Sequence, residues 1–200
     1  DIKNPERYIE LLKSHKIIRY ATYKSQYILF EGTDIDIESE LYKAATIVPR
    51  PTLTVENVQD YVNANIMLAV KSYYTTGTPR YFQYHLSNTP ITTDPQGDID
   101  GFVNLVLPTY ASFTDVKAAS NEQGKAILYA YFLNTDDIIS HLHEVFKLKY
   151  LLENVVLEDR VAANEVKNIL NYEVELLNKA LNENLFDGTS VLWCFQAKEV

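Results

Sequence analysis

Cysteine and methionine are almost absent from this chain of 200 residues. Its one cysteine, Cys194, cannot form a disulfide within the chain, and one cysteine with four histidines does not give the spacing of a zinc site. This usage favours a reducing compartment, so we expect a cytoplasmic protein. The one methionine is Met67 and the chain begins at Asp1, so we expect a piece of a longer polypeptide whose active site can lie outside it.

Long apolar runs are also missing. The longest lies near 127–133, far below the roughly 18 residues that a membrane-spanning helix needs, and no basic and then apolar leader opens the chain. We therefore expect no membrane partner. A hydrophobic share of 46% with a charged share of 22% is typical of a folded domain and excludes a disordered chain.

Positive charge is scarce except near the start of the chain. The net charge is −9, which argues against a general nucleic-acid coat. Residues 1–30 nevertheless hold six Lys or Arg against three Asp or Glu, whereas residues 31–60 hold two against seven. Only the first thirty residues are basic enough to contact phosphate groups.

The first 48 residues predict a helix, a hairpin and a second helix. Asn4-Pro5-Glu6 is typical of a helix start, and the helix should end near His15. Two runs rich in β-branched and aromatic residues, 17–20 and 27–30, predict a β-hairpin. A helix followed by a hairpin is how a winged-helix domain ends, so we interpret residues 1–48 as a winged-helix-like remnant.

The second predicted helix starts at the Thr33/Asp34 pair and runs to about Thr46, before Pro49-Arg50-Pro51 stops it. A further helix is expected from Thr54 to a C-cap at Gly77, because apolar residues recur there at helical spacing. Residues 49–200 should form an α/β domain.

Four strands and three helices are predicted in the rest of that domain, and together they indicate a mixed sheet of about four strands covered by helices. The expected strands are 79–86, 101–107, 126–133 and 190–195, and the expected helices are 113–120, 135–152 and about 158–185.

No catalytic, metal-binding or cofactor-binding residues can be assigned. The Asp34-x-Asp36-x-Glu38 alternation lacks the glycine of a calcium loop. His141 and His143 are two residues apart, which places them on different sides of a helix. Gly124-Lys125 lacks the other residues of a phosphate-binding loop, and Cys194 lies in an apolar strand. We expect no cofactor in this fragment, and whether the parent protein is an enzyme stays open.

Five basic residues are candidates for contact with DNA or a protein partner. Lys13, Lys16, Arg19 and Lys24 lie in or beside the predicted hairpin, which could act as a wing that touches the DNA backbone. Winged-helix modules in large ATPases also serve as joints between proteins, and the acidic segment 31–40 lies beside this one. Arg80 follows a polar stretch that is either a contact loop or a capped helix end.

Two passages of the chain resemble a known family. They are Tyr27-Ile28-Leu29-Phe30-Glu31-Gly32-Thr33-Asp34-Ile35-Asp36, after the basic strand 17–20, and Thr76-Gly77-Thr78-Pro79-Arg80-Tyr81-Phe82. They are similar to the region that follows the P-loop core of very large bacterial phage-defence ATPases, the BREX-type ATP-binding proteins. Residues 159–166 also look like a helix start of that family.

The resemblance implies an accessory segment of an ATPase that acts with partner proteins, and with DNA, in defence against phage. The family's ATP site would lie N-terminal to this chain, so no nucleotide-binding residue is carried over. Our first hypothesis is a non-catalytic interaction segment of such an ATPase, which contacts other subunits or the rest of the parent chain. The alternative is a DNA-binding winged-helix regulator with a helical dimerisation domain.

Overall fold

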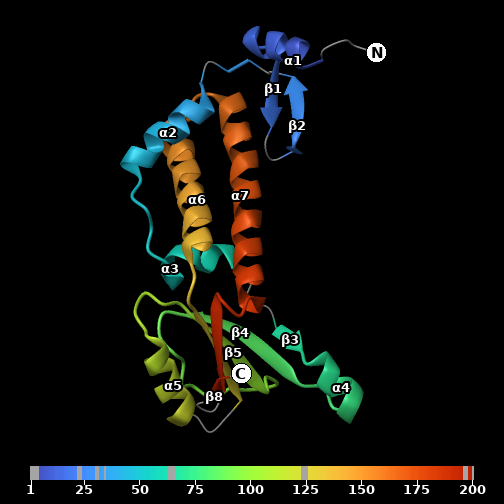
Figure 1. Cartoon of the computed structure of the whole chain (residues 1–200), viewed down its shortest axis with the longest axis vertical. Helices are drawn as coiled ribbons and strands as arrows, with labels where there is room; N and C mark the ends of the chain where they lie inside the picture. Colours follow the sequence, from blue (N-terminus) through green and yellow to red (C-terminus); the bar gives the residue numbers. More distant parts are fainter. Residues whose placement is uncertain are drawn as a thin grey trace. The chain divides into compact units, whose positions relative to one another are not determined.

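The computed structural model describes residues 5–21, 24–29, 32–33, 35–62, 66–122, 126–195 and 198–199. In chain order its helices and strands are α1 (Pro5–Ser14), β1 (Ile18–Ala21), β2 (Gln26–Leu29), α2 (Ile37–Ile47), α3 (Val55–Val58), the single 3-10 turn η2 (Gln59–Tyr61), β3 (Ile66–Leu68), α4 (Val70–Thr76), β4 (Tyr81–Ser87), β5 (Gly101–Val106), α5 (Phe113–Glu122), β6 (Ile127–Phe132), α6 (Asp136–Asn154), α7 (Arg160–Phe186), β7 (Val191–Phe195) and β8 (Lys198–Glu199) (Figure 1).

The chain divides into two compact units, within each of which the residues lie close together in space. The first unit contains residues 1–49 and 143–175, and the second contains residues 50–142 and 176–200. The first unit thus includes the C-terminal part of α6 and the N-terminal part of α7, a grouping that no sequence signal indicated.

A mixed sheet forms the second unit and confirms the predicted α/β class. Its strand order is β3-β4-β5-β6-β7-β8, in which β4, β5 and β6 are parallel and the other neighbours are antiparallel. The four predicted strands are confirmed as β4 to β7. The short strands β3 and β8, which the sequence analysis did not predict, extend the sheet at its two edges.

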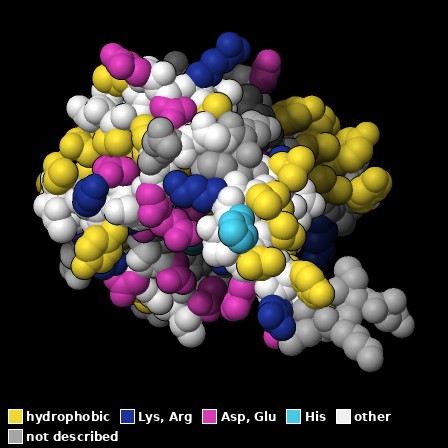
Figure 2. Space-filling view, turned by 90° about the horizontal axis from the view of Figure 1, so that it is seen from above, with side chains coloured by type: hydrophobic (Ala, Val, Ile, Leu, Met, Phe, Trp, Pro, Cys, Tyr) yellow, Lys and Arg dark blue, Asp and Glu magenta, His cyan; other side chains and the backbone are white. Residues whose placement is uncertain are grey.

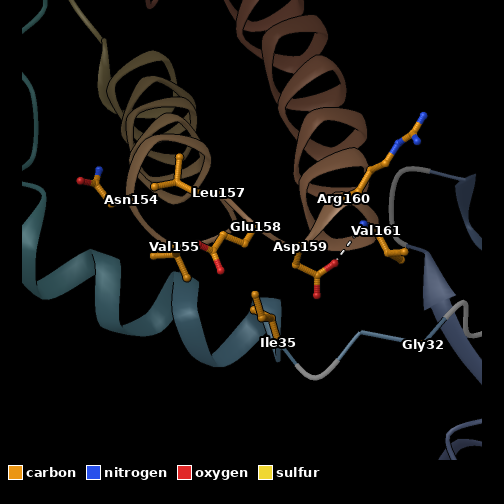
Figure 3. Close-up of a pocket in the computed structure, with 9 residues that line it drawn as sticks. All are labelled: Gly32, Ile35, Asn154, Val155, Leu157, Glu158, Asp159, Arg160 and Val161. Atoms are coloured by element: carbon orange, nitrogen blue, oxygen red, sulfur yellow. Dashed lines mark hydrogen bonds between the residues drawn. The ribbon is translucent and has the colours of Figure 1, made fainter.

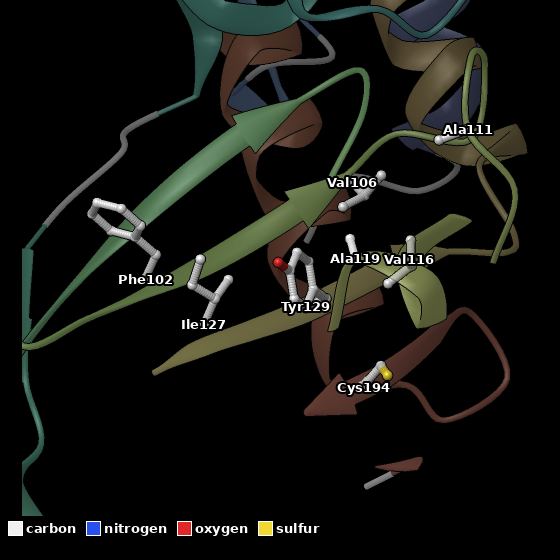
Figure 4. Close-up of a cluster of buried hydrophobic side chains, with 8 residues drawn as sticks. All are labelled: Phe102, Val106, Ala111, Val116, Ala119, Ile127, Tyr129 and Cys194. Atoms are coloured by element: carbon white, nitrogen blue, oxygen red, sulfur yellow. The ribbon is translucent and has the colours of Figure 1, made fainter. Parts of the chain in front are cut away.

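One face of this sheet packs against α5 and the loop between β4 and β5. Phe102 and Val106 of β5 and Ile127 and Tyr129 of β6 alternate along their strands and meet Val116 of α5 (Figure 4). All residues of β5 are buried, so its apolar run is explained by cover on both faces. Cys194 is buried in the same cluster, in line with its place in a predicted apolar strand.

A buried asparagine fixes the loop that joins the parallel strands β4 and β5. Asn104 is fully buried, and its side-chain amide donates to the carbonyl oxygen of His85 (3.0 Å) and to Ser87 Oγ (2.7 Å). Its Oδ1 accepts from the backbone N–H of Ile91 (3.0 Å), and Tyr129 Oη donates to the Ile91 carbonyl (2.7 Å). Because buried polar groups are costly when unpaired, this network holds the loop to the sheet.

The single helix predicted from Thr54 to Gly77 is wrong. The chain forms α3 and η2, then the edge strand β3, and only then α4. Helical periodicity was present, but residues 66–68 pair with 81–83 of β4, and this pairing between distant residues overrides a pattern that is only local. Gly77 does end α4 with φ 72°, so the predicted C-cap is confirmed.

The core of the first unit is a cluster in which α2 packs against α6 and α7. Ala44 of α2 is buried with Leu148 and Leu151 of α6 and with Ala162 and Val166 of α7. These apolar positions recur at helical spacing, which explains why each of the three helices forms.

The start of α2 differs from the prediction. The helix begins at Ile37, after Asp36, whose carboxylate accepts from the backbone N–H of Ser39 (3.2 Å). Thr33 is not the cap, because its hydroxyl oxygen accepts from the N–H of Ile35 (3.0 Å) and it donates to Asp159 Oδ2 (2.5 Å). Asp34 and the predicted N-cap Asn4 of the first helix lie outside the described residues.

Gly101 should tolerate no side chain. A Cβ at this position would lie 2.5 Å from the carbonyl oxygen of Ala126 and 2.4 Å from the ring of Phe82. Since a backbone atom in a sheet cannot move aside cheaply, we expect Gly101→Ala to lower the free energy of unfolding by about 1–3 kcal/mol in urea denaturation. Gly188→Ala, where nothing lies within 4 Å, should change it by less than about 0.5 kcal/mol. Equal effects of the two changes would contradict the close packing.

Stability should fall at alkaline pH partly through Tyr129. Burial, with a smaller contribution from Cys194, raises the pKa of Tyr129 from 10.0 to about 12. Between these two values the unfolded chain loses the phenol proton while the folded chain keeps it, so stability is full below pH 10.0 and declines towards about pH 12. Denaturant titrations over this pH range should show that the free energy of unfolding falls less steeply with pH in Tyr129→Phe than in Tyr110→Phe. The second change alters an exposed tyrosine. Parallel declines for the two variants would contradict the assignment.

Candidate interaction surface

The helix and hairpin formed by α1, β1 and β2 bury very little. No residue of α1 or β2 is buried, and only Ala21 is buried in β1. Several large apolar side chains are therefore exposed, up to 72% for Leu29. We call the exposed set the helix–hairpin surface: Tyr8, Leu11, Ile17, Tyr20, Tyr27 and Leu29. In the view from above, hydrophobic and Lys or Arg side chains lie beside one another on the visible face (Figure 2).

An ion pair attaches this hairpin to α7. The Arg19 guanidinium donates to Glu165 Oε1, and the side chains are 29% and 7% exposed respectively. Removing Arg19 would leave a carboxylate that is almost buried without its arginine. Arg19 is one of the five predicted contact residues. Its guanidinium is already paired within the first unit, so it is not fully available to a phosphate group.

A second polar contact ties the segment after the hairpin to the start of α7. Thr33 donates to Asp159, whose other oxygen accepts from the N–H groups of Val161 and Ala162 (2.9 Å each). These hydrogen bonds, that from Thr33 most of all, hold the pKa of Asp159 below its usual range. Asp159 thus caps α7 and occupies the site where a helix N-terminus would otherwise bind an anion.

A cavity of about 710 Å³ lies beside this contact. Glu158 and Asp159 of the turn between α6 and α7 face the same space as Ile35, which precedes α2 (Figure 3). Glu158 and Arg160 are exposed on its rim, and no histidine or cysteine lines it. The cavity holds no pair of groups arranged as a nucleophile and its base.

A smaller cavity of about 360 Å³ lies between the end of α1, β1 and the start of α2. It brings together three of the predicted contact residues, Lys13, Lys16 and Arg19. Tyr20, Ile35 and Ile37 supply its apolar lining, and Asp36 and Glu38 stand on the α2 side. We call it the lysine cavity.

Lys16 has an unusual backbone conformation for a lysine. Its φ is 52°, in the left-handed region that glycine adopts most easily. The N–H of Lys16 bonds to the Lys13 carbonyl (3.0 Å) and the N–H of Ile17 to the Leu12 carbonyl (2.9 Å), which is the Schellman end of a helix. Helix α1 thus ends as predicted, but a lysine takes the position that glycine favours.

The two other predicted contact residues lie elsewhere. Lys24 is exposed in the connection between β1 and β2. Arg80 belongs to the second unit, where it pairs with Asp100 (2.5 Å), and this bond, with the N–H of Tyr81, lowers the pKa of that carboxyl. The hydrogen bond from the N–H of Gly77 to the Tyr73 carbonyl makes the preceding segment a capped helix end.

The described residues contain no cluster of His, Cys, Asp or Glu suited to a metal ion. Of the two histidines weighed as ligands, His143 instead lies 2.9 Å from the Val48 carbonyl through Nε2. None of the described helices has the length and apolar character needed to cross a bilayer.

Comparisons with family models, with curated proteins and with solved structures find no match for this chain.

The sequence could not reveal the residue that pairs with Arg19 or the apolar residues that line the lysine cavity. Glu165 lies in a predicted helix and pairs with a residue 146 positions earlier, so no local pattern marks it. Tyr20, Ile35 and Ile37 look like ordinary strand and helix residues. The only usable signal was the excess of basic residues before position 30.

The ion pair can be tested by a double-mutant cycle. We expect Arg19→Met to lower the free energy of unfolding by about 2–4 kcal/mol, because the nearly buried Glu165 loses its arginine. Arg19→Met with Glu165→Met should cost less than the sum of the two single changes by about 1–3 kcal/mol. Lys43→Met, which removes the pair between the exposed Lys43 and the partly buried Glu40, should cost at most about 1 kcal/mol. Additive single changes would show that the pair contributes nothing.

Lys16→Gly should stabilise the protein. Glycine relieves the left-handed backbone, so we expect thermal or urea unfolding to show a gain of about 1 kcal/mol. Ser25→Gly is a matched control, because Ser25 also has a positive φ of 50° but carries no charge. A loss of stability in Lys16→Gly would mean that the lysine side chain stabilises the fold by more than the backbone strain.

Proposed function

We propose that this chain is a non-catalytic interaction module of a large bacterial P-loop ATPase of the BREX type, acting in defence against phage. Its helix–hairpin surface would dock on other subunits or on the rest of the parent chain. The observation that carries the proposal is that α1 buries none of its residues while it and the hairpin expose six large apolar side chains. An apolar surface of this kind typically marks a contact with another protein.

Four described residues of the two passages that resemble the family have a clear structural role, which supports this proposal. Gly32 and Gly77, the glycines of the two passages, have φ of 79° and 72°. Only glycine adopts this region without strain, so a family that keeps these two turns needs glycine there. Arg80 of the second passage is held by Asp100, and Thr33 of the first by Asp159.

A DNA-binding regulator remains the second candidate because of Lys13 and Lys16. Both line one cavity and neither makes an ion pair with a described carboxylate. The acidic residues on the α2 side of that cavity oppose a uniformly anionic ligand, and the net charge of −9 weakens attraction to DNA over longer distances.

The helix–hairpin surface can be tested in the parent protein. We expect Leu11→Ser with Leu29→Ser to abolish co-purification with the partner subunits, or docking within the parent chain, since both side chains lie open to a partner. Stability should change by less than about 0.5 kcal/mol for each change, and binding of an ATP analogue by the parent should be unaffected. Tyr42→Ser, an exposed apolar change on α2, is the control.

Two results would contradict the proposal. One is assembly that persists at wild-type level in the leucine variant. The other is tight binding of the chain to duplex DNA in fluorescence anisotropy, with a steep loss of affinity as salt rises, which would support the regulator instead.

A further inference from the structure

We infer that the lysine cavity binds a short protein segment with three features in this order along its chain: an acidic side chain, an apolar side chain, and a hydrogen-bond donor or basic group. This inference rests on the proposed function and names the chemistry of the partner. The cavity has a volume of about 360 Å³, within the range of sites that hold a small ligand or a few side chains.

The anionic part of the segment is selected by two lysines. Lys13 in the last turn of α1 and Lys16 just after the helix both line the cavity, and among the described residues neither is neutralised by a carboxylate within 4 Å. Arg19 beside them is already held by Glu165 and fixes the β1 wall. The lysines are therefore the cationic groups in the cavity that can meet an acidic side chain.

The backbone conformation of Lys16 also supports a binding role for this residue. A glycine would end α1 with less strain, since φ is 52° at this residue. Strained conformations that persist are found preferentially at binding sites. A lysine at this position instead contributes a charge to the lining of the cavity.

The opposite wall selects against nucleic acid. Asp36 already caps α2 through the N–H of Ser39, so this helix N-terminus is not open to an anion, and Glu38 is exposed beside it. A phosphate backbone is negative along its whole length and would face both carboxylates. A peptide can instead present an N–H group or a basic side chain to Glu38 while an acidic side chain meets the lysines.

The apolar lining completes the match. Tyr20, Ile35 and Ile37 contribute an aromatic ring and two branched side chains to the cavity. Tyr20 also stacks edge to face on Tyr27, with ring centroids 5.1 Å apart, so the site continues into the helix–hairpin surface. An apolar side chain between the acidic and basic groups of the partner would fill this space.

The test uses the full chain labelled with nitrogen-15 and a capped tripeptide of glutamate, phenylalanine and lysine. We expect the amide signals of Tyr20, Ile35 and Ile37 to shift on titration. Lys13→Gln and Lys16→Gly should each weaken binding by about threefold, as expected for the loss of one exposed charge pair. Lys43→Gln, on an exposed face of α2, should bind as the wild type does. A peptide with lysine in place of the glutamate should bind more weakly.

Two variants separate a binding role from a structural one. Lys16→Gly is expected to be more stable and yet a weaker binder, a combination that a purely structural lysine would not produce. Glu38→Gln should weaken binding of the tripeptide but strengthen any binding of duplex DNA, because it removes a negative charge.

Three results would overturn the inference: no shifts at the cavity, shifts that the lysine variants leave unchanged, or duplex DNA that shifts the same amides more strongly than the peptide. If the leucine variant of the helix–hairpin surface loses assembly while the lysine variants keep it, the interaction module stands and only the chemistry assigned to the cavity is wrong.

Discussion

The ion pair between Arg19 and Glu165 is the contact on which the candidate surface depends. Helix α1 and strand β2 bury no residue, so hydrophobic burial contributes little to holding the helix and hairpin in place. A nearly buried carboxylate on α7 that meets an arginine on β1 supplies an attachment that adds little net stability but is costly to break by removing one partner. The hydrogen bond from Thr33 to Asp159 adds a second attachment at the start of the same helix.

Most of the fold was readable from local patterns. The four strands β4 to β7 and the helices α5, α6 and α7 coincide with predicted segments, because their apolar spacing matches the geometry of the element that they form. The helix predicted from Thr54 to Gly77 was wrong, since β3 is fixed by pairing with residues of β4 rather than by its own sequence. Likewise Asp36, rather than Thr33, caps α2, because Thr33 is occupied by Asp159 more than a hundred residues later.

Only some residues of the candidate site could be predicted from the sequence. Composition pointed to the basic residues before position 30, and the structure brings Lys13, Lys16 and Arg19 to one cavity. What the sequence could not show was that Glu165 neutralises Arg19, or that Asp36 and Glu38 form the opposite side of that cavity. Both facts depend on contacts between segments that are distant in the chain. They change the description from a basic surface, for which DNA and a protein partner were both candidates, to a cavity with a positive and a negative side.

A surface that is exposed and weakly anchored has a thermodynamic consequence for its partner. A ligand that binds only the folded arrangement stabilises it by RT ln(1 + [L]/Kd), so a docking partner would add to the stability of the helix and hairpin what burial does not supply. The same linkage means that the helix and hairpin need not be rigid alone, because the partner would cover Leu11 and Leu29 and engage Lys13 and Lys16 at once. The apolar contacts would then provide most of the affinity, while the charges at the cavity, paired only in the correct orientation, would determine which segment binds.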